Sequence, residues 1–248
     1  MLSNLIGDLA KLTLAIACIY FIGGAYVSRC RPQWSRALKQ RRISTLLLLI
    51  LATIAVKLTE DVQGGESGPL DRSILLFIHA HVPGALTGWF EALTVSGSGA
   101  VQIALTVAVT LALLFLGHRR EALLMAASVG GGALLVLLVK TLSARERPEL
   151  WNAAWYWGSS FPSGHTLVVA AFATAAVLSL RRVAPTARWQ APVSALAVSW
   201  IVLVAASRLV LGVHWPTDVV VAACLGACVS LAINMGLDLS RIGRHTRP

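Results

Sequence analysis

The sequence predicts an all-α, polytopic bundle of membrane-spanning helices, and composition, apolar runs and charge placement together support this fold class. Of the 248 residues, 56% are hydrophobic and 13% are charged, against roughly 25% charged residues in an average soluble domain. Apolar runs recur at lengths close to the roughly 20 residues that cross a bilayer. The net charge of +10 comes from short basic segments between these runs. A nucleic-acid partner is not expected, because such a partner requires cations on one water-exposed face.

Seven apolar runs define the expected spans. They cover residues 12–27, 43–59, 99–116, 122–142, 166–180, 192–211 and 217–237. In the first run the basic residues follow the apolar core, which indicates an uncleaved anchor rather than a signal peptide. Between the second and third runs, the apolar spacing from Asp71 through Trp89 and Phe90 predicts one or two short helices at the membrane surface.

The basic segments all fall on one side of the predicted bundle. They are residues 29–42, 119–120, 181–188 and 241–247. By the positive-inside rule this side is cytoplasmic, which places residues 60–98, 143–163 and 212–216 on the outer face. The outer aromatic run of Trp151, Trp155, Tyr156 and Trp157 is then expected in the headgroup region, as an aromatic belt or as the lining of an access path for a lipid tail.

We expect three parts in the chain. Residues 1–42 form an extra N-terminal transmembrane helix with its basic cytoplasmic loop, residues 43–240 form a six-helix core, and residues 241–248 form a basic cytoplasmic tail. The four cysteines have neither a zinc-type spacing nor a disulfide pattern and are interpreted as packing residues. His79, His81 and Lys57 are interpreted as interfacial or structural, with Lys57 pairing locally with Glu60 or Asp61.

Polar clusters at the outer ends of the later helices mark the candidate site, since charges there are costly unless they pair or bind a ligand. In the first cluster, Lys140 and Arg147 are two helical turns apart and share a face if the helix continues. Pro148 disfavours helical geometry at the preceding residue. We therefore expect the helix to end near Arg147 and to leave its guanidinium able to swing over a ligand.

The second cluster opens the fifth span. Ser163 is the expected N-cap, and the unpaired N–H groups and partial positive charge of a helix start favour an anion such as phosphate. Gly164 allows the backbone to approach that anion closely. His165 lies in the first turn, beside the expected anion.

The third cluster contains Arg208, His214 and Asp218. If the last helix begins near Pro216, the Asp218 carboxylate can reach back to the imidazole four residues earlier. A carboxylate on one ring nitrogen fixes the tautomer and makes the other nitrogen a better nucleophile or base. Alone, such a pair is more often a structural hydrogen bond, but the three clusters on one face together describe a phosphate site.

These residues resemble the three signature motifs of the type 2 phosphatidic acid phosphatase superfamily, Lys-x6-Arg-Pro, Pro-Ser-Gly-His and Ser-Arg-x5-His-x3-Asp. The resemblance covers about residues 43–237. It implies that His214 attacks phosphorus with help from Asp218, that a phosphohistidine forms, and that His165 protonates the leaving group. It further implies that the phosphate is held by Lys140, Arg147, Arg208 and the backbone at Ser163 and Gly164, with no metal or other cofactor.

The resemblance implies an integral-membrane lipid phosphatase. Together with the charge bias, which places the site on the outer face, it leads us to expect a bacterial inner membrane with the site facing the periplasm or cell exterior. The expected substrate is a lipid phosphate monoester or diphosphate, of the undecaprenyl diphosphate, phosphatidylglycerophosphate or phosphatidic acid type. Two alternatives stay open. One is a lipid phosphotransferase with a lipid diphosphate donor, and the other is a transporter or scaffold with buried structural charges. The sequence leaves the oligomeric state open.

Overall fold

The computed structural model describes residues 2–151, 158–186 and 188–245, and all regular elements within these ranges are helical. The all-α prediction is therefore confirmed. In chain order the elements are α1 (Leu2–Cys30), α2 (Pro32–Gln40), α3 (Arg42–Gln63), α4 (Gly68–His81), the short 3-10 helix η1 (Gly84–Leu86), α5 (Thr87–Val95), α6 (Gly99–Phe115), α7 (Arg119–Leu142), α8 (Gly164–Val183), α9 (Gln190–Val210) and α10 (Pro216–His245).

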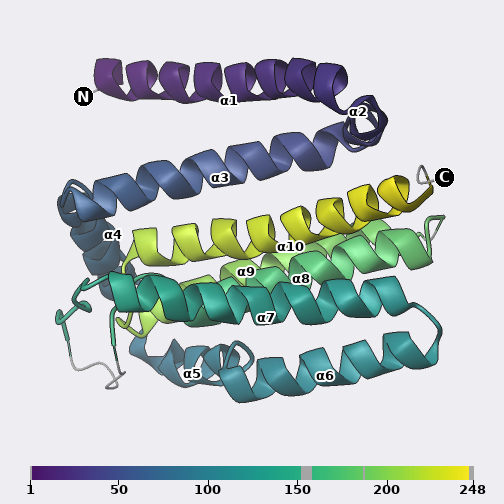
Figure 1. Cartoon of the computed structure of the whole chain (residues 1–248). Helices are drawn as coiled ribbons and strands as arrows, with labels where there is room; N and C mark the ends of the chain where they lie inside the picture. Colours follow the sequence, from purple (N-terminus) through teal and green to yellow (C-terminus); the bar gives the residue numbers. More distant parts are fainter. Residues whose placement is uncertain (1, 152–157, 187, 246–248) are drawn as a thin grey trace.

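The long helices lie side by side in one bundle (Figure 1). Helix α8 packs against α7, α9 and α10, while α3 covers α10 and α6 covers α7. Within the described residues, six helices are long and apolar enough to cross a membrane, namely α1, α3, α7, α8, α9 and α10; α6 is apolar but has 17 residues. All seven predicted runs are thus helical, and the chain is an integral membrane protein.

Helices α4 and α5 form a bent pair between α3 and α6. Their axes meet at 94°, so the pair is a broken span or a re-entrant segment by length and composition. Pro83, which has an extended backbone, precedes η1 and separates the two helices. The prediction of short helices in this segment is confirmed, and their place at the membrane surface stays a prediction.

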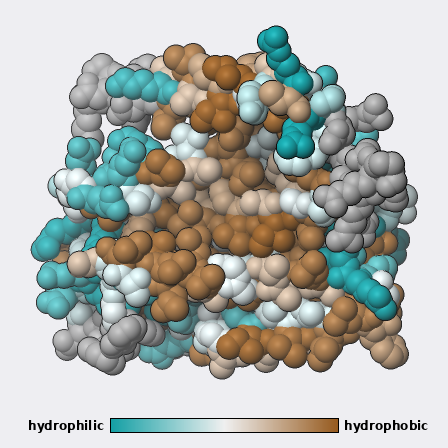
Figure 2. Space-filling view, in the orientation of Figure 1, coloured by the Kyte–Doolittle hydropathy of each residue, from teal (hydrophilic) through white to brown (hydrophobic). Residues whose placement is uncertain are grey.

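Many large apolar side chains are exposed on the surface of the bundle, as expected for contact with lipid. Figure 2 shows hydrophobic residues across the middle of the visible face and hydrophilic residues gathered toward its two sides. Inside the bundle, α7 and α8 share an apolar core of Leu124, Met125, Val129, Phe172 and Ala175. Because lipid tails are as apolar as these side chains, close packing and interhelical hydrogen bonds stabilise such a bundle.

Helices α8 and α10 lie in close contact at Gly226. A Cβ atom at this position would lie 2.2 Å from the carbonyl oxygen of Leu167, so only glycine fits. One turn later, the Ser230 hydroxyl donates a hydrogen bond of 2.8 Å to the Ala171 carbonyl. Small residues at a helix interface allow such backbone contact in membranes. The contact fixes the two helices that carry the second and third polar clusters.

An ionic cluster of buried and half-buried side chains lies at the end of the bundle opposite these polar clusters. Asp238 of α10 contacts Arg120 of α7 at 2.6 Å, Arg182 of α8 at 3.0 Å and Arg41 at 3.3 Å. Glu121 contacts Arg182 at 3.5 Å and Arg120 at 3.7 Å. Charges at membrane depth are costly unless they are paired. Arg120 of α7 and Arg182 of α8 therefore have structural partners.

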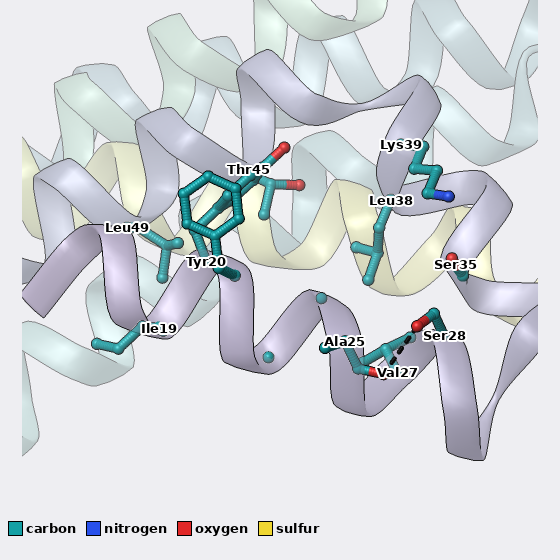
Figure 3. Close-up of a pocket in the computed structure, with 13 residues that line it drawn as sticks. Ile19, Tyr20, Ala25, Val27, Ser28, Ser35, Leu38, Lys39, Thr45 and Leu49 are labelled. Atoms are coloured by element: carbon teal, nitrogen blue, oxygen red, sulfur yellow. Dashed lines mark hydrogen bonds between the residues drawn. The ribbon is translucent and has the colours of Figure 1, made fainter.

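Helix α1 lies at the edge of the bundle and contacts α2 and α3 (Figure 1). Between these three helices is a cavity of about 450 Å³. Tyr20 and Leu49 lie on its walls and Lys39 lies near the α2 side (Figure 3). The division of the chain into an extra helix, a core and a tail stays a prediction.

Several residues outside the predicted site have the local roles that the sequence indicated. Lys57 pairs with Asp61 at 2.5 Å. His79 stacks on Trp151 and His81 stacks on Phe77. The four cysteines are free thiols. Of the outer aromatic run, Trp155, Tyr156 and Trp157 lie outside the described residues.

We expect Gly226→Ala to lower the stability of the protein by about 1–3 kcal/mol, because the added methyl group forces α8 and α10 apart. Thermal unfolding in detergent measures this change. Gly236→Ala is the matched control on the same helix, since a Cβ there meets nothing within 4 Å. Equal midpoints for the two variants would contradict the proposed backbone contact.

Candidate active site

The first cluster is arranged differently from the prediction. Helix α7 ends at Leu142, and Ser143 is already extended, so the expectation of a helix to about Arg147 is wrong by five residues. The reason is a tertiary contact: the carbonyl of Arg145 accepts hydrogen bonds from the Ser160 N–H at 2.9 Å and the Ser159 hydroxyl at 3.3 Å. These bonds replace the next helical turn.

Lys140 and Arg147 nevertheless converge, because both contact the Ser159 carbonyl. The Lys140 Nζ atom donates to it at 2.5 Å and Arg147 Nη2 at 3.4 Å. Arg147 Nη1 also donates to the Val213 carbonyl at 2.8 Å. The expectation that Arg147 swings over the ligand is therefore wrong for this state, in which backbone carbonyls hold the guanidinium in place.

The second cluster lies at the start of α8. Ser163 is the N-cap as predicted, but its side chain makes no capping bond. Instead, its hydroxyl accepts a bond of 3.1 Å from Thr166, and its N–H donates to the Asp218 carbonyl at 3.2 Å. The first helical bond runs from Leu167 to Ser163. The N–H groups of Gly164, His165 and Thr166 are consequently the ones that the helix start can offer to an anion.

The third cluster depends on the sharp turn between α9 and α10. Gly212 has a φ of +65°, and a Cβ there would lie 2.5 Å from the indole nitrogen of Trp151. Helix α10 begins at Pro216, as predicted. His214 Nδ1 consequently lies 3.5 Å from Asp218 Oδ2, at the outer limit of a hydrogen bond. This contact leaves Nε2 as the ring nitrogen available to a substrate.

Arg208, on the last turn of α9, completes the cluster. Its side chain is buried, and Nη1 donates a bond of 2.7 Å to the Thr94 hydroxyl. His165 lies within electrostatic range of Lys140, Arg147, Arg208 and His214. The structure therefore brings the three predicted clusters together at one end of the bundle.

Arg145 is a site residue that the sequence analysis missed. Its Nη1 atom contacts Asp218 Oδ1 at 2.5 Å, and its Nη2 atom contacts Asp71 Oδ2 at 2.6 Å. Both carboxylates are buried. One signal was present in the sequence, because Arg145 lies between Lys140 and Arg147 in the first motif. Asp71 gave only a weak signal as an acidic residue in an otherwise apolar helical spacing.

The environment of His214 favours its neutral form. Burial is the main cause and lowers the pKa of His214 to about 4, with help from Arg208 and Arg147 and against the opposing effect of Asp218. A neutral imidazole retains the lone pair that a nucleophile or base needs. The site can therefore combine an unprotonated nucleophile with several cations.

We expect His214 to remain neutral between pH 8 and about pH 5, because the pKa of its imidazole lies near 4 in the folded protein. Nitrogen NMR of histidine-labelled protein in detergent measures this titration, and the signal that His214→Asn removes identifies the residue. A midpoint near 6.5 would contradict the proposed effect of burial.

Several known proteins are similar to this chain in sequence. A profile of the PAP2 superfamily matches residues 121–238. Phosphatidylglycerophosphatase B of Escherichia coli strain K12 is 38% identical over 100 residues, which is 38% of this chain and 37% of that protein. The chain thus aligns with little more than a third of that relative's length.

Two further relatives align over most of the chain. The undecaprenyl-diphosphatase of Sulfolobus acidocaldarius is 28% identical over 191 residues, 75% of this chain and 85% of that protein. The crystal structure of a transmembrane PAP2 type phosphatidylglycerolphosphate phosphatase from Bacillus subtilis superposes with a TM-score of 0.66 at 26% identity, covering 79% of this chain and 96% of that one. The match to the PAP2 superfamily thus covers the part of the chain that carries the three polar clusters.

Proposed function

We propose that the chain is a lipid phosphatase that removes phosphate through a phosphohistidine on His214. The contact of His214 Nδ1 with Asp218 Oδ2 supports this most directly, because it directs Nε2 away from the carboxylate. Around this histidine lie Arg147 and Arg208, whose charges act on it. A neutral nucleophile facing fixed cations is suited to attack a phosphoryl group.

In the first step, the Nε2 lone pair of His214 forms a bond to phosphorus while the bond from phosphorus to the leaving oxygen breaks. The leaving oxygen, which belongs to the lipid alcohol or to a lipid monophosphate, takes a proton from His165. Asp218 stabilises the positive charge that develops on the imidazole, as the aspartate of a catalytic triad does. Lys140, Arg147 and Arg208 hold the phosphoryl oxygens, with the N–H groups at the start of α8 beside them.

In the second step, a water molecule attacks the phosphorus of the phosphohistidine. His165, now unprotonated, accepts a proton from this water, and the bond between phosphorus and Nε2 breaks. Inorganic phosphate leaves and both histidines return to their starting states. The cations of the site neutralise phosphoryl charge, which is the role that magnesium has in other phosphoryl-transfer sites, so we propose that the reaction needs no metal.

The substrate class follows from the membrane setting and from the relatives. A site at the end of a transmembrane bundle can take a headgroup while the lipid tails stay in the bilayer. The relatives are named for phosphatidylglycerophosphate and for undecaprenyl diphosphate. We propose that this chain acts on a lipid of one of these two kinds or on phosphatidic acid.

We expect purified protein in detergent to release phosphate from at least one of these three lipids in excess chelator. His214→Ala removes the nucleophile and should reduce the rate by a factor of about 10⁴ or more. The matched control is His81→Ala, because His81 is exposed and stacks on Phe77 outside the site. Phosphate release is measured for each lipid with all three proteins.

Three outcomes would contradict this proposal. Undiminished release by His214→Ala would exclude His214 as the nucleophile, and loss of activity in chelator would exclude the metal-independent reaction. Phosphate that appears on an added acceptor lipid, with no inorganic phosphate released, would identify a phosphotransferase instead.

We also propose that the site faces the periplasm or cell exterior of a bacterial inner membrane, because the basic segments lie at the opposite end of the bundle. Glu66 and Thr186 are exposed residues in loops at the two ends. In a chain with Cys18 and Cys30 replaced by serine, an impermeant maleimide should label Glu66→Cys in intact cells and Thr186→Cys only after lysis. The reverse pattern would contradict the orientation.

A further inference from the structure

Residues 68–97, which we call the positioning segment, comprise α4, η1, α5 and the turn into α6. This segment lies outside the family match, which begins at residue 121. Three of its residues nevertheless touch the site from outside the signature motifs. They are Asp71 on α4, Thr94 on α5 and Gly97 in the turn.

Asp71 binds two groups, namely Arg145, which also binds Asp218, and Thr217 at the start of α10. Its Oδ2 atom accepts bonds from Arg145 Nη2 at 2.6 Å and from the Thr217 hydroxyl at 2.7 Å, and its Oδ1 atom accepts the Thr217 N–H at 2.9 Å. Asp71 is 1% exposed. Through Arg145, this carboxylate determines where Asp218 lies beside His214.

Thr94 orients the arginine of the third motif. Its hydroxyl accepts the bond of 2.7 Å from Arg208 Nη1, and both residues are buried. A buried guanidinium presents its donors in a fixed planar fork, so one anchored nitrogen fixes the direction of the others. Thr94 therefore helps to aim Arg208 at the phosphoryl oxygens.

Gly97 supports His165 from behind. A Cβ atom at this position would lie 2.9 Å from Cγ1 of Val204 and 3.2 Å from Cβ of His165. Two hydrogen bonds to Ser96 hold the turn in place. The Ser96 carbonyl accepts a bond of 2.8 Å from the Gln102 side-chain amide, and the Ser96 hydroxyl accepts a bond of 2.9 Å from the Trp200 indole N–H. The backbone at Gly97 thus packs closely beside the His165 side chain and leaves no room for a Cβ atom.

We propose that the positioning segment sets the geometry of the catalytic groups, with Asp71 acting through Arg145 on Asp218, Thr94 acting on Arg208, and Gly97 acting on His165. The inference rests on the proposed phosphatase function and adds three positioning residues to it. Each acts on a different group, so each has its own kinetic consequence.

The test compares three variants with three matched controls. The variants are Asp71→Asn, Thr94→Val and Gly97→Ala. The controls are Asp61→Asn, which alters only the local pair with Lys57, Thr87→Val on the exposed side of α5, and Gly99→Ala, where a Cβ meets nothing within 4 Å. For each protein we would measure kcat and KM for phosphate release, inhibition by orthovanadate, which mimics a transferring phosphoryl group, and the thermal midpoint.

We expect Asp71→Asn and Gly97→Ala to lower kcat by about 10- to 100-fold with little change in KM, because they displace groups that act in the chemical step. Thr94→Val should instead weaken vanadate inhibition by about tenfold or more, because it disturbs a phosphate-binding arginine. Thr94→Ser keeps the hydroxyl and should restore inhibition. The three controls should resemble the wild type.

Wild-type kinetics in all three variants would overturn the inference. The inference would also be overturned if kcat and the thermal midpoint fell together in every variant and Thr94→Ser behaved like Thr94→Val. That pattern would show that these residues have a structural role alone. If Asp71→Asn fails to fold, the comparison of Thr94→Val with Thr94→Ser still distinguishes a positioning role from a structural role. Failure of the proposed function is distinct, since the wild-type protein itself would then release no phosphate from any of the lipids.

Discussion

One guanidinium held between two buried carboxylates organises the end of the bundle that carries the three polar clusters. Arg145 joins Asp71 and Asp218, and through them it ties α4, the extended segment after α7 and the start of α10 to one another. Removing one partner from such a buried ionic group leaves an uncompensated charge, which is strongly destabilising. The placement of His214 beside Asp218 therefore depends on Arg145 and on its second partner, Asp71.

The same interaction determines the charge that a substrate meets. At the end with the three polar clusters, Arg145 pairs with Asp71 and Asp218, and Lys140, Arg147 and Arg208 add further positive charge. This positive charge suits a phosphate monoester, which carries up to two negative charges near neutral pH. At the opposite end, Arg41, Arg120 and Arg182 surround Asp238 and Glu121. At that end the carboxylates lie between the arginines, and the cluster holds α7, α8 and α10 together.

The sequence was sufficient for the features that depend on local pattern. Apolar runs predicted all seven long helices, and Pro216 predicted the start of α10. The motif residues were identified because they are polar or charged residues at the ends of apolar runs and match three signature motifs. The end of α7 was missed, because the Arg145 carbonyl bonds to Ser159 and Ser160, which no local preference indicates. Thr94 and Asp71 were missed for the same reason, since their partners Arg208 and Arg145 lie far away in the chain.

The position of α4 and α5 before the family match has a consequence for how proteins that carry the three motifs are compared. A search that weighs the signature motifs treats two chains as equivalent when all three motifs are complete. Yet in this chain the surroundings of Asp218, Arg208 and His165 are built partly by residues 68–97. Two proteins with identical motifs can therefore differ in rate through α4 and α5, which a comparison of motifs does not examine.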